Sequence, residues 1–133
     1  MARNVIFLDT QALLWWAVDP ERLSSVARQR CAEMNIEGGD ASSISLWELG
    51  IKIARGKRDI GLPIEEFARR VDASGVVTTL AVDARIWLKS LQLDGNHRDP
   101  ADRVIVASAL LTGVPLLTKD LVLRDDERCP TVW

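Results

Sequence analysis

The chain is built around Asp99-Pro100-Ala101-Asp102-Arg103, followed by Val104-Ile105-Val106-Ala107-Ser108-Ala109. This stretch predicts a helix start, because Asp99 suits an N-cap, Pro100 suits the first helical position and Asp102 falls in the first turn. The residues behind it are apolar or small on nearly every side, so we expect the helix to be buried and to close at Gly113. A buried helix whose first turn projects a carboxylate is well placed to help build a metal site.

Around this helix, strand patterns alternate with helix patterns along the whole chain. Apolar runs predict strands at 4–8, 76–80 and 114–118, and shorter ones at 41–43 and 131–133. Periodic or capped segments predict helices at 11–18, 26–34, 44–55, 82–93 and from 63 to near 72, with a turn at 37–40. The alternation, without repeats or a linker, predicts a single α/β domain over 1–133. We expect a three-layer, doubly wound sandwich in which helices flank a central, mostly parallel sheet of four or five strands.

Two of the predicted helices carry apolar stripes that we expect to face the core. In the helix at 44–55 the stripe consists of Ile44, Trp47, Ile51 and Ala54, and in the helix at 82–93 of Ala84, Trp87, Leu88 and Leu91.

Composition restricts the class of protein. The 133 residues are 47% hydrophobic and 27% charged with a net charge of −2, which suits a globular chain and opposes a non-specific nucleic-acid binder. An acidic metal centre with a few local cations remains compatible with that charge. Cys31 and Cys129 lack a metal-type spacing and are expected as reduced core residues. No apolar run reaches membrane-spanning length and Val5–Leu8 is too short for a signal peptide, so we expect a cytoplasmic protein.

Four acidic residues have related positions in this predicted fold. Asp9 and Asp120 each follow a strand, so both are expected at the carboxyl edge of the sheet, where open α/β sheets bind ligands. Asp102 opens the helix before the strand of Asp120, and Glu48 joins them if its helix packs at the same edge. Gathered carboxylates need a cation, and an all-oxygen set selects Mg²⁺ or Mn²⁺. A water on such an ion can attack a phosphodiester, which suggests a metal-dependent nuclease.

Each acid also has a simpler explanation. Asp9 could cap the helix that follows it, and Glu48 could pair with Lys52. Asp102 could be an acidic residue stabilised by the helix dipole at a helix start, and Asp120 could be a loop residue. The residue pattern alone leaves both interpretations open.

Four segments taken together resemble the signature segments of the PIN-domain family, and especially its VapC-type toxin branch. They are Val5–Thr10, Ser43–Leu49, Arg98–Arg103 and Leu117–Asp120. The resemblance implies that Asp9, Glu48, Asp102 and Asp120 bind the metal of an Mg²⁺- or Mn²⁺-dependent endoribonuclease, with Thr10 and Thr118 supporting carboxylates or phosphate. It favours Asp102 as the ligand and Asp99 as a cap or supporting neighbour. It also implies a homodimer, and an antitoxin whose tail occupies the active-site groove.

Basic and aromatic residues are candidates for RNA contact. Arg98 and Arg103 flank the acidic turn and could hold phosphate or pair with acids, and Arg55, Lys57 and Arg58 form a basic turn that a solvated helix end explains equally well. Trp15 and Trp16 could stack on bases, although one in the core and one lining a groove or subunit contact is the favoured interpretation. His97 is the only histidine, which argues against a histidine triad or a zinc site.

Two other classes of function compete with a nuclease. A phosphoryl-transfer or signalling domain on a similar sheet would require further acids, but Gln11 stands two residues after Asp9 where a phosphatase would have an aspartate. A catalytically inactive PIN-like module that binds RNA or a partner is the other alternative. Loss of one acid would favour it, and all four are present.

Overall fold

The computed structural model describes residues 4–93, 99–124 and 129–133. The elements in chain order are β1 (Phe7–Leu8), α1 (Thr10–Val18), a 3₁₀ turn (Pro20–Arg22), α2 (Ser25–Glu37), β2 (Gly39–Ser42), α3 (Ser43–Ala54), α4 (Ile64–Ala73), β3 (Val77–Leu80), α5 (Ala84–Leu91), α6 (Pro100–Thr112), β4 (Leu116–Leu117), α7 (Leu121–Arg124) and β5 (Thr131–Val132). Within these residues the strands form one sheet in the order β3-β2-β1-β4-β5, and every pairing is parallel. The predicted doubly wound α/β fold is confirmed.

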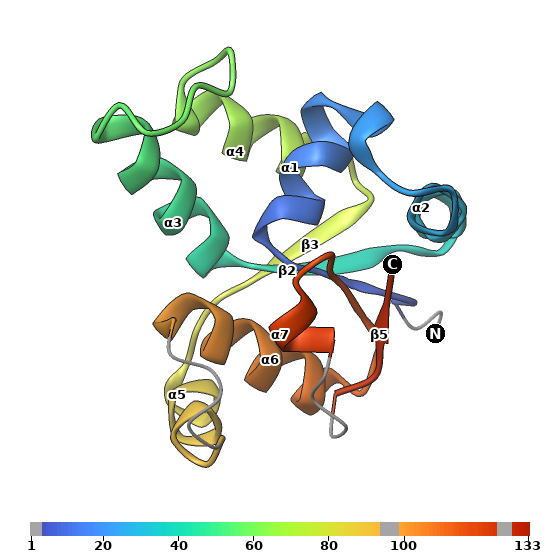
Figure 1. Cartoon of the computed structure of the whole chain (residues 1–133), viewed down its shortest axis with the longest axis vertical. Helices are drawn as coiled ribbons and strands as arrows, with labels where there is room; N and C mark the ends of the chain where they lie inside the picture. The colour runs from blue at the N-terminus through green and yellow to red at the C-terminus, as the bar shows by residue number, and fades with distance from the viewer. Residues whose placement is uncertain (1–3, 94–98, 125–128) are drawn as a thin grey trace.

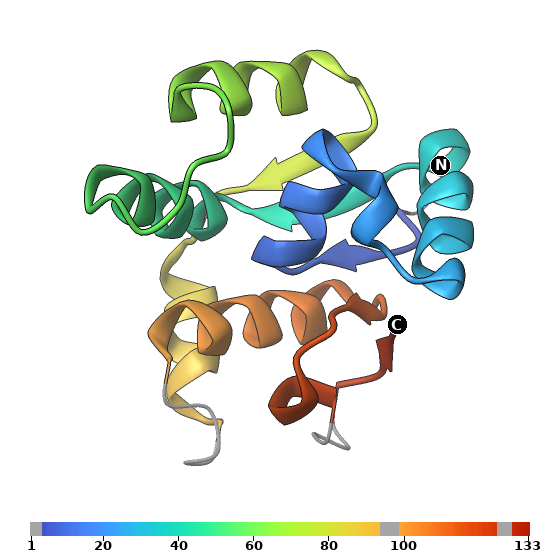
Figure 2. The same ribbon diagram turned by 45° about the horizontal axis from the view of Figure 1, so that its top comes forward.

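The sheet separates two cores, because successive strand residues point to opposite faces. Ile6 and Leu8 pack into the core beneath α1, α2 and α4, whereas Phe7 packs into the core beneath α5 and α6. In β4, Leu117 and Leu116 divide between the same two cores. Figures 1 and 2 show α1 and α4 on one side of the strands and α5, α6 and α7 on the other. Burial on both faces explains why β1 and β4 are apolar at every position.

Helix α6 is the buried helix that the sequence predicts. Asp99 is its N-cap and its Oδ1 accepts a hydrogen bond of 2.9 Å from the backbone N–H of Ala101. The helix closes at Gly113, whose φ of 73° is left-handed and suits a residue without a side chain. Every residue from Val104 to Ala109 is buried. The packing therefore fixes the first turn of α6, with Asp102, relative to the sheet.

The predicted turn at residues 37–40 is only partly correct. Gly38 makes the turn with a φ of 98°, but β2 begins at Gly39. A Cβ atom at Gly39 would collide with the side chain of Met34 at the end of α2. A strand can begin at Gly39 because glycine has no side chain and lets Met34 approach its backbone closely. Strand propensity does not reveal such a contact.

The apolar stripe predicted to face the core from α5 points outward, and so does part of the stripe on α3. Trp87, Leu88 and Leu91 are 48%, 62% and 74% exposed, and Trp47 on α3 is 61% exposed. We call these four residues the α3–α5 surface. Ile86 and Ser90 are the buried residues of α5. The prediction was wrong because helical periodicity identifies an apolar face but not what covers it.

Two predictions from composition can be compared with the structure. Cys31 and Cys129 are both buried in the core, as expected, and burial raises the pKa of the Cys31 thiol to about 11. Among the described residues, no helix has the length and apolar character needed to cross a membrane.

Candidate active site

The winding of the sheet reverses between β1 and β4, and two predicted site residues lie at this point. From β1 the strand order continues to β2 and β3, and from β4 it continues to β5 on the other side. Asp9 directly follows β1, and Asp120 follows β4 by three residues. Phe7 pairs with Leu116, so the two strands end level with each other. Open α/β sheets bind ligands in the crevice that forms at such a reversal.

A cleft of about 470 Å³ opens at this edge of the sheet. Five carboxylates from four parts of the chain line it: Asp9, Glu48, Asp99 and Asp102 from the start of α6, and Asp120. The structure thus brings the four predicted acids together and adds Asp99 to them. We call this space the acidic cleft.

Asp9 is buried and held in place by two hydrogen bonds. Its Oδ1 accepts from the backbone N–H of Ala12 at 2.8 Å, which caps α1, and its carboxylate also accepts from the hydroxyl of Thr118. Burial raises its pKa from 3.8 to about 6, the two hydrogen bonds oppose that rise, and the charges of Asp120 and Glu48 add to it. The capping explanation for Asp9 is therefore correct, and it coexists with a place in the cleft.

The two threonines predicted to support the site have different partners. Thr118 is fully buried, and its oxygen accepts a 3.0 Å hydrogen bond from the backbone N–H of Asp120 in addition to its bond to Asp9. Thr10 lines the cleft, but its hydroxyl lies 2.9 Å from the hydroxyl of Ser45. Thr118 thus orients carboxylate-bearing residues, whereas Thr10 links α1 to α3.

Asp102 has the higher of the two raised pKa values in the cleft, about 7 compared with an ordinary 3.8. Burial is the largest cause, followed by the charge of Asp99 and then by Asp120, Glu48 and Asp9. Asp99 lies one helical turn away with its Oδ1 engaged as the N-cap. The ionised form of Asp102 is therefore disfavoured both by burial and by the neighbouring carboxylates.

Glu48 and Asp120 complete the group from opposite sides. Glu48 projects from α3, with its Oε2 4.0 Å from the Nζ of Lys52. Asp120 begins the turn into α7, and its Oδ1 accepts a 2.8 Å hydrogen bond from the backbone N–H of Val122. The simple explanation that Glu48 forms a surface pair with Lys52 is geometrically correct, but the pair lies inside the cleft rather than away from it.

The carboxylates fit a hard divalent cation by their chemistry rather than by a preformed cage. Among the described residues, no three acidic, cysteine or histidine side chains stand close enough together to form a ready-made metal site. Carboxylates that share a pocket repel one another, and a cation allows several ionised ones to converge. Mg²⁺ or Mn²⁺ would bind such an all-oxygen donor set. The bound cation would also stabilise the ionised carboxylates of Asp9 and Asp102, whose pKa values are raised in its absence.

Comparison with known proteins identifies the family. The family model described as PIN domain matches residues 6–125. The chain belongs to the PIN-domain family. Over 139 residues it is 31% identical to the Mycobacterium tuberculosis protein named Ribonuclease VapC22, a match that covers 98% of this chain and 99% of that protein.

Solved structures with the same fold extend this comparison. VapBC2 from Rickettsia felis bound to a promoter DNA fragment matches with a TM-score of 0.68 at 15% identity, covering 96% of this chain and 97% of that one. FitAcB from Neisseria gonorrhoeae matches with a TM-score of 0.63 at 19% identity and 97% coverage of each chain. A toxin–antitoxin complex from Klebsiella pneumoniae matches with a TM-score of 0.60 at 16% identity, covering 97% and 96%. At these identities the likeness shows the fold.

The basic residues of this PIN domain divide into those that reach the cleft and those that do not. Lys52, Arg58 and Lys119 line it together with the acids. Arg55 and Lys57 are exposed, and neither is among the described residues that line the acidic cleft. The Nη2 of Arg103 donates a 2.8 Å hydrogen bond to the backbone oxygen of Leu93 and so ties α6 to the segment after α5. Arg98 and His97 lie outside the described residues.

Sequence reasoning did not assign four residues of the cleft to the site: Gln11, Leu49, Lys52 and Lys119. Lys119 Nζ lies 5.5 Å from the centre of the Trp15 ring, which in turn packs 5.8 Å from the ring of Trp133. Trp15 lines the cleft, whereas Trp16 Nε1 donates a 3.2 Å hydrogen bond to Asn35 on α2. Both tryptophans are partly buried and pack against the core, and Trp15 also lines the cleft, which agrees with the expectation that one of the two lines a groove.

Proposed function

We propose that this PIN domain is a metal-dependent endoribonuclease and the toxin of a toxin–antitoxin pair, acting in the cytoplasm. The observation that carries the proposal is the meeting of five carboxylates in one cleft at the reversal point of the sheet. The full-length similarity to a protein named as a VapC ribonuclease supports RNA as the substrate.

Asp9, Glu48, Asp102 and Asp120 would hold Mg²⁺ or Mn²⁺ in this proposal. The bound ion supplies a water of lowered pKa and stabilises negative charge on the phosphate. The chain itself contributes orientation: Thr118 and the N–H of Ala12 fix Asp9, and the cap of α6 fixes the first turn that carries Asp102. Lys52, Arg58 and Lys119 place positive charge at the rim, where an RNA strand must approach an acidic site.

A second protein and a second copy of this chain are the proposed partners. The antitoxin partner is supported by the fold neighbours, which are toxin–antitoxin complexes. The homodimer is supported by the α3–α5 surface, because four large apolar side chains gathered on two helices are typical of an interaction site. Ile44, Val82 and Pro100 extend it into an apolar hollow of about 350 Å³ beside Trp47 and Trp87. In a two-fold dimer each copy would offer this same surface to the other.

The experiment that tests the proposed activity is cleavage of a total RNA pool by the purified, antitoxin-free protein. We expect discrete fragments with Mg²⁺ or Mn²⁺, and none with EDTA or with Asp9→Asn. Asp72→Asn, which removes an exposed carboxylate of α4 outside the cleft, is the matched control and should cleave like the wild type. A folded protein that binds divalent metal but leaves RNA intact under every condition would contradict the proposal and favour a binding-only module.

A further inference from the structure

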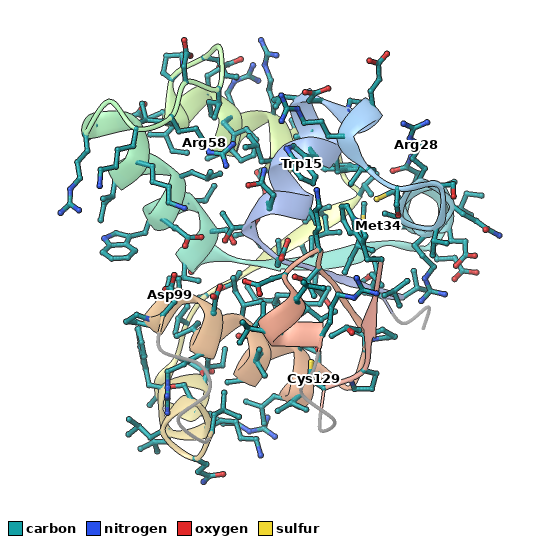
Figure 3. The ribbon with its side chains drawn as sticks, viewed as in Figure 1. Trp15, Arg28, Met34, Arg58, Asp99 and Cys129 are labelled. Carbon is teal, nitrogen blue, oxygen red and sulfur yellow. The ribbon has the colours of Figure 1, made fainter. Side chains whose placement is uncertain are left out.

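The acidic cleft adjoins a second hollow on the side of α1. This side hollow has a volume of about 270 Å³ and is bordered at its far end by Asp19 and Arg22. Trp15 and Arg58 line both spaces, so the two meet between these side chains. Figure 3 shows Trp15 and Arg58 near each other beside α1, with Asp99 across from them at the start of α6. A path therefore leads from the acidic cleft into the side hollow, between the ring of Trp15 and the guanidinium group of Arg58.

Arg58 is held at this junction by a residue from the start of α1. Its Nη2 donates a 2.6 Å hydrogen bond to the Oε1 of Gln11, which lies 47 positions earlier in the chain. A guanidinium group can only donate, so the carboxamide must turn its oxygen towards Arg58. That orientation leaves the Nε2 of Gln11 buried without a hydrogen-bond partner in the described structure. Gln11 thus gives up one of its own hydrogen bonds and holds the arginine without neutralising it.

The charges along the path differ in what they contact. Lys52 lies 4.0 Å from Glu48, and the Nε of Arg22 lies 2.8 Å from Asp19. Arg58 and Lys119 instead contact neutral groups, the amide of Gln11 and the ring of Trp15. Among the described residues, Arg58 and Lys119 therefore form no ion pair and are the cations that can meet a phosphate where the path leaves the carboxylates, while Asp59 and the paired Asp19 and Arg22 line the side hollow beyond them.

We propose that Arg58, positioned by Gln11, binds a phosphate of the RNA strand next to the bond that is cut, and that this strand leaves the acidic cleft between Trp15 and Arg58 towards Arg22. The inference rests on the proposed ribonuclease activity and adds to it a strand path and a positioning pair. A planar guanidinium matches phosphate geometry with two parallel N–H donors. A positive groove with an aromatic wall is also how proteins hold single-stranded nucleic acid.

The test measures binding of a fluorescein-labelled, mixed-sequence, single-stranded RNA of about a dozen nucleotides. All variants are made in an Asp102→Asn background so that the strand stays intact, and thermal unfolding confirms that each is folded. For Arg58→Ala we expect affinity to fall roughly tenfold, the effect of losing one charged hydrogen-bonded contact. We also expect the slope of log Kd against log salt, measured from about 50 to about 200 mM KCl, to fall by about 0.7, the value for one phosphate on a single strand.

Substitutions at Gln11 separate positioning from charge. Gln11→Ala should weaken binding by less than Arg58→Ala and leave the salt slope unchanged, because the cation is still present but no longer held. Gln11→Glu should reproduce the lower slope of Arg58→Ala, because a carboxylate would neutralise the guanidinium. Arg58→Lys should keep the slope and recover part of the affinity. The matched control is Arg69→Ala, which removes an exposed arginine of α4 that hydrogen-bonds Glu66 at 2.9 and 2.6 Å.

The outcomes distinguish this inference from the activity on which it rests. A wild-type protein that neither binds nor cuts RNA contradicts the proposed function itself. A wild-type protein that cuts RNA while Arg58→Ala binds it like Arg69→Ala overturns the strand path alone. If Arg58→Ala leaves RNA binding intact and instead weakens binding of the co-expressed antitoxin, the junction holds a protein segment and the assignment to RNA is wrong.

Discussion

The hydroxyl of Thr118 donates a hydrogen bond to the carboxylate of Asp9, across the boundary between the two central strands. The same oxygen accepts the backbone N–H of Asp120 at 3.0 Å. One fully buried side chain therefore sets the positions of two carboxylate-bearing residues, and it can do so because β1 and β4 are neighbours that end level with each other.

Replacing Thr118 by valine keeps the shape of the side chain and removes both hydrogen bonds. We expect Thr118→Val to lower the free energy of unfolding by about 1–2 kcal/mol, the cost of unpaired buried polar groups. We expect RNA cleavage to fall by about tenfold or more, as it does when the groups that orient metal ligands are lost. Chemical denaturation and initial cleavage rates measure the two effects. Thr118→Ser, which retains the hydroxyl, should keep the cleavage rate even if it loses some stability, and equal activity of Thr118→Val would contradict this role.

The metal-free protein should lose stability as the pH rises. The folded pKa values of Asp9, about 6, and Asp102, about 7, both exceed the ordinary value of 3.8, so the folded state binds more protons than the unfolded state between about pH 4 and pH 7. The contribution of these two carboxyls to stability is fully present below about pH 4 and is lost as the pH rises through this window. In EDTA at pH 8, Asp102→Asn should be more stable than the wild type by on the order of 2 kcal/mol, a figure reduced from the full pKa shift because solvent screens the partly exposed Asp102, and its stability should depend less on pH. Thermal unfolding at pH 5 and pH 8 checks this, and a wild-type protein that is more stable at pH 8 would contradict it.

The α3–α5 surface should hold two copies of the chain together. Leu88 and Leu91 are exposed, so Leu88→Glu and Leu91→Glu should leave the fold intact while placing a charge in the interface. Sedimentation of the antitoxin-free protein should show a dimer that either substitution converts to a monomer. Ile36→Glu, on α2 and 88% exposed, is the matched control and should remain dimeric. A wild-type monomer, or a dimer that survives both leucine substitutions, would mean that this surface has another occupant.

Most of the fold was predictable because local signals agreed with the overall architecture. The apolar runs of β1 and β4, the cap at Asp99 and the stop at Gly113 each needed only short-range chemistry. Asp9 and Asp120 could be placed together because both follow parallel strands. Glu48 could not be placed in the same way, since its position depends on how α3 packs against the sheet edge.

The errors came from relationships that no local pattern contains. The stripe on α5 was correctly recognised as apolar, but periodicity could not show that Trp87, Leu88 and Leu91 would be left uncovered. The start of β2 depends on the side chain of Met34 lying against Gly39. The bond between Arg58 and Gln11 joins residues 47 positions apart, so Arg58 could not be distinguished by sequence from its basic neighbours.

The central claim is that the carboxylates of the acidic cleft hold the metal that cuts RNA. The most direct test is a crystal of the protein soaked in Mn²⁺, with diffraction recorded on both sides of the manganese absorption edge. We expect an anomalous peak in the cleft about 2.0–2.3 Å from oxygens of Asp9 and Asp102, and no peak in crystals of Asp102→Asn. A cleft without a peak, in crystals of a protein whose Mn²⁺-dependent RNA cleavage has been demonstrated, would contradict the claim.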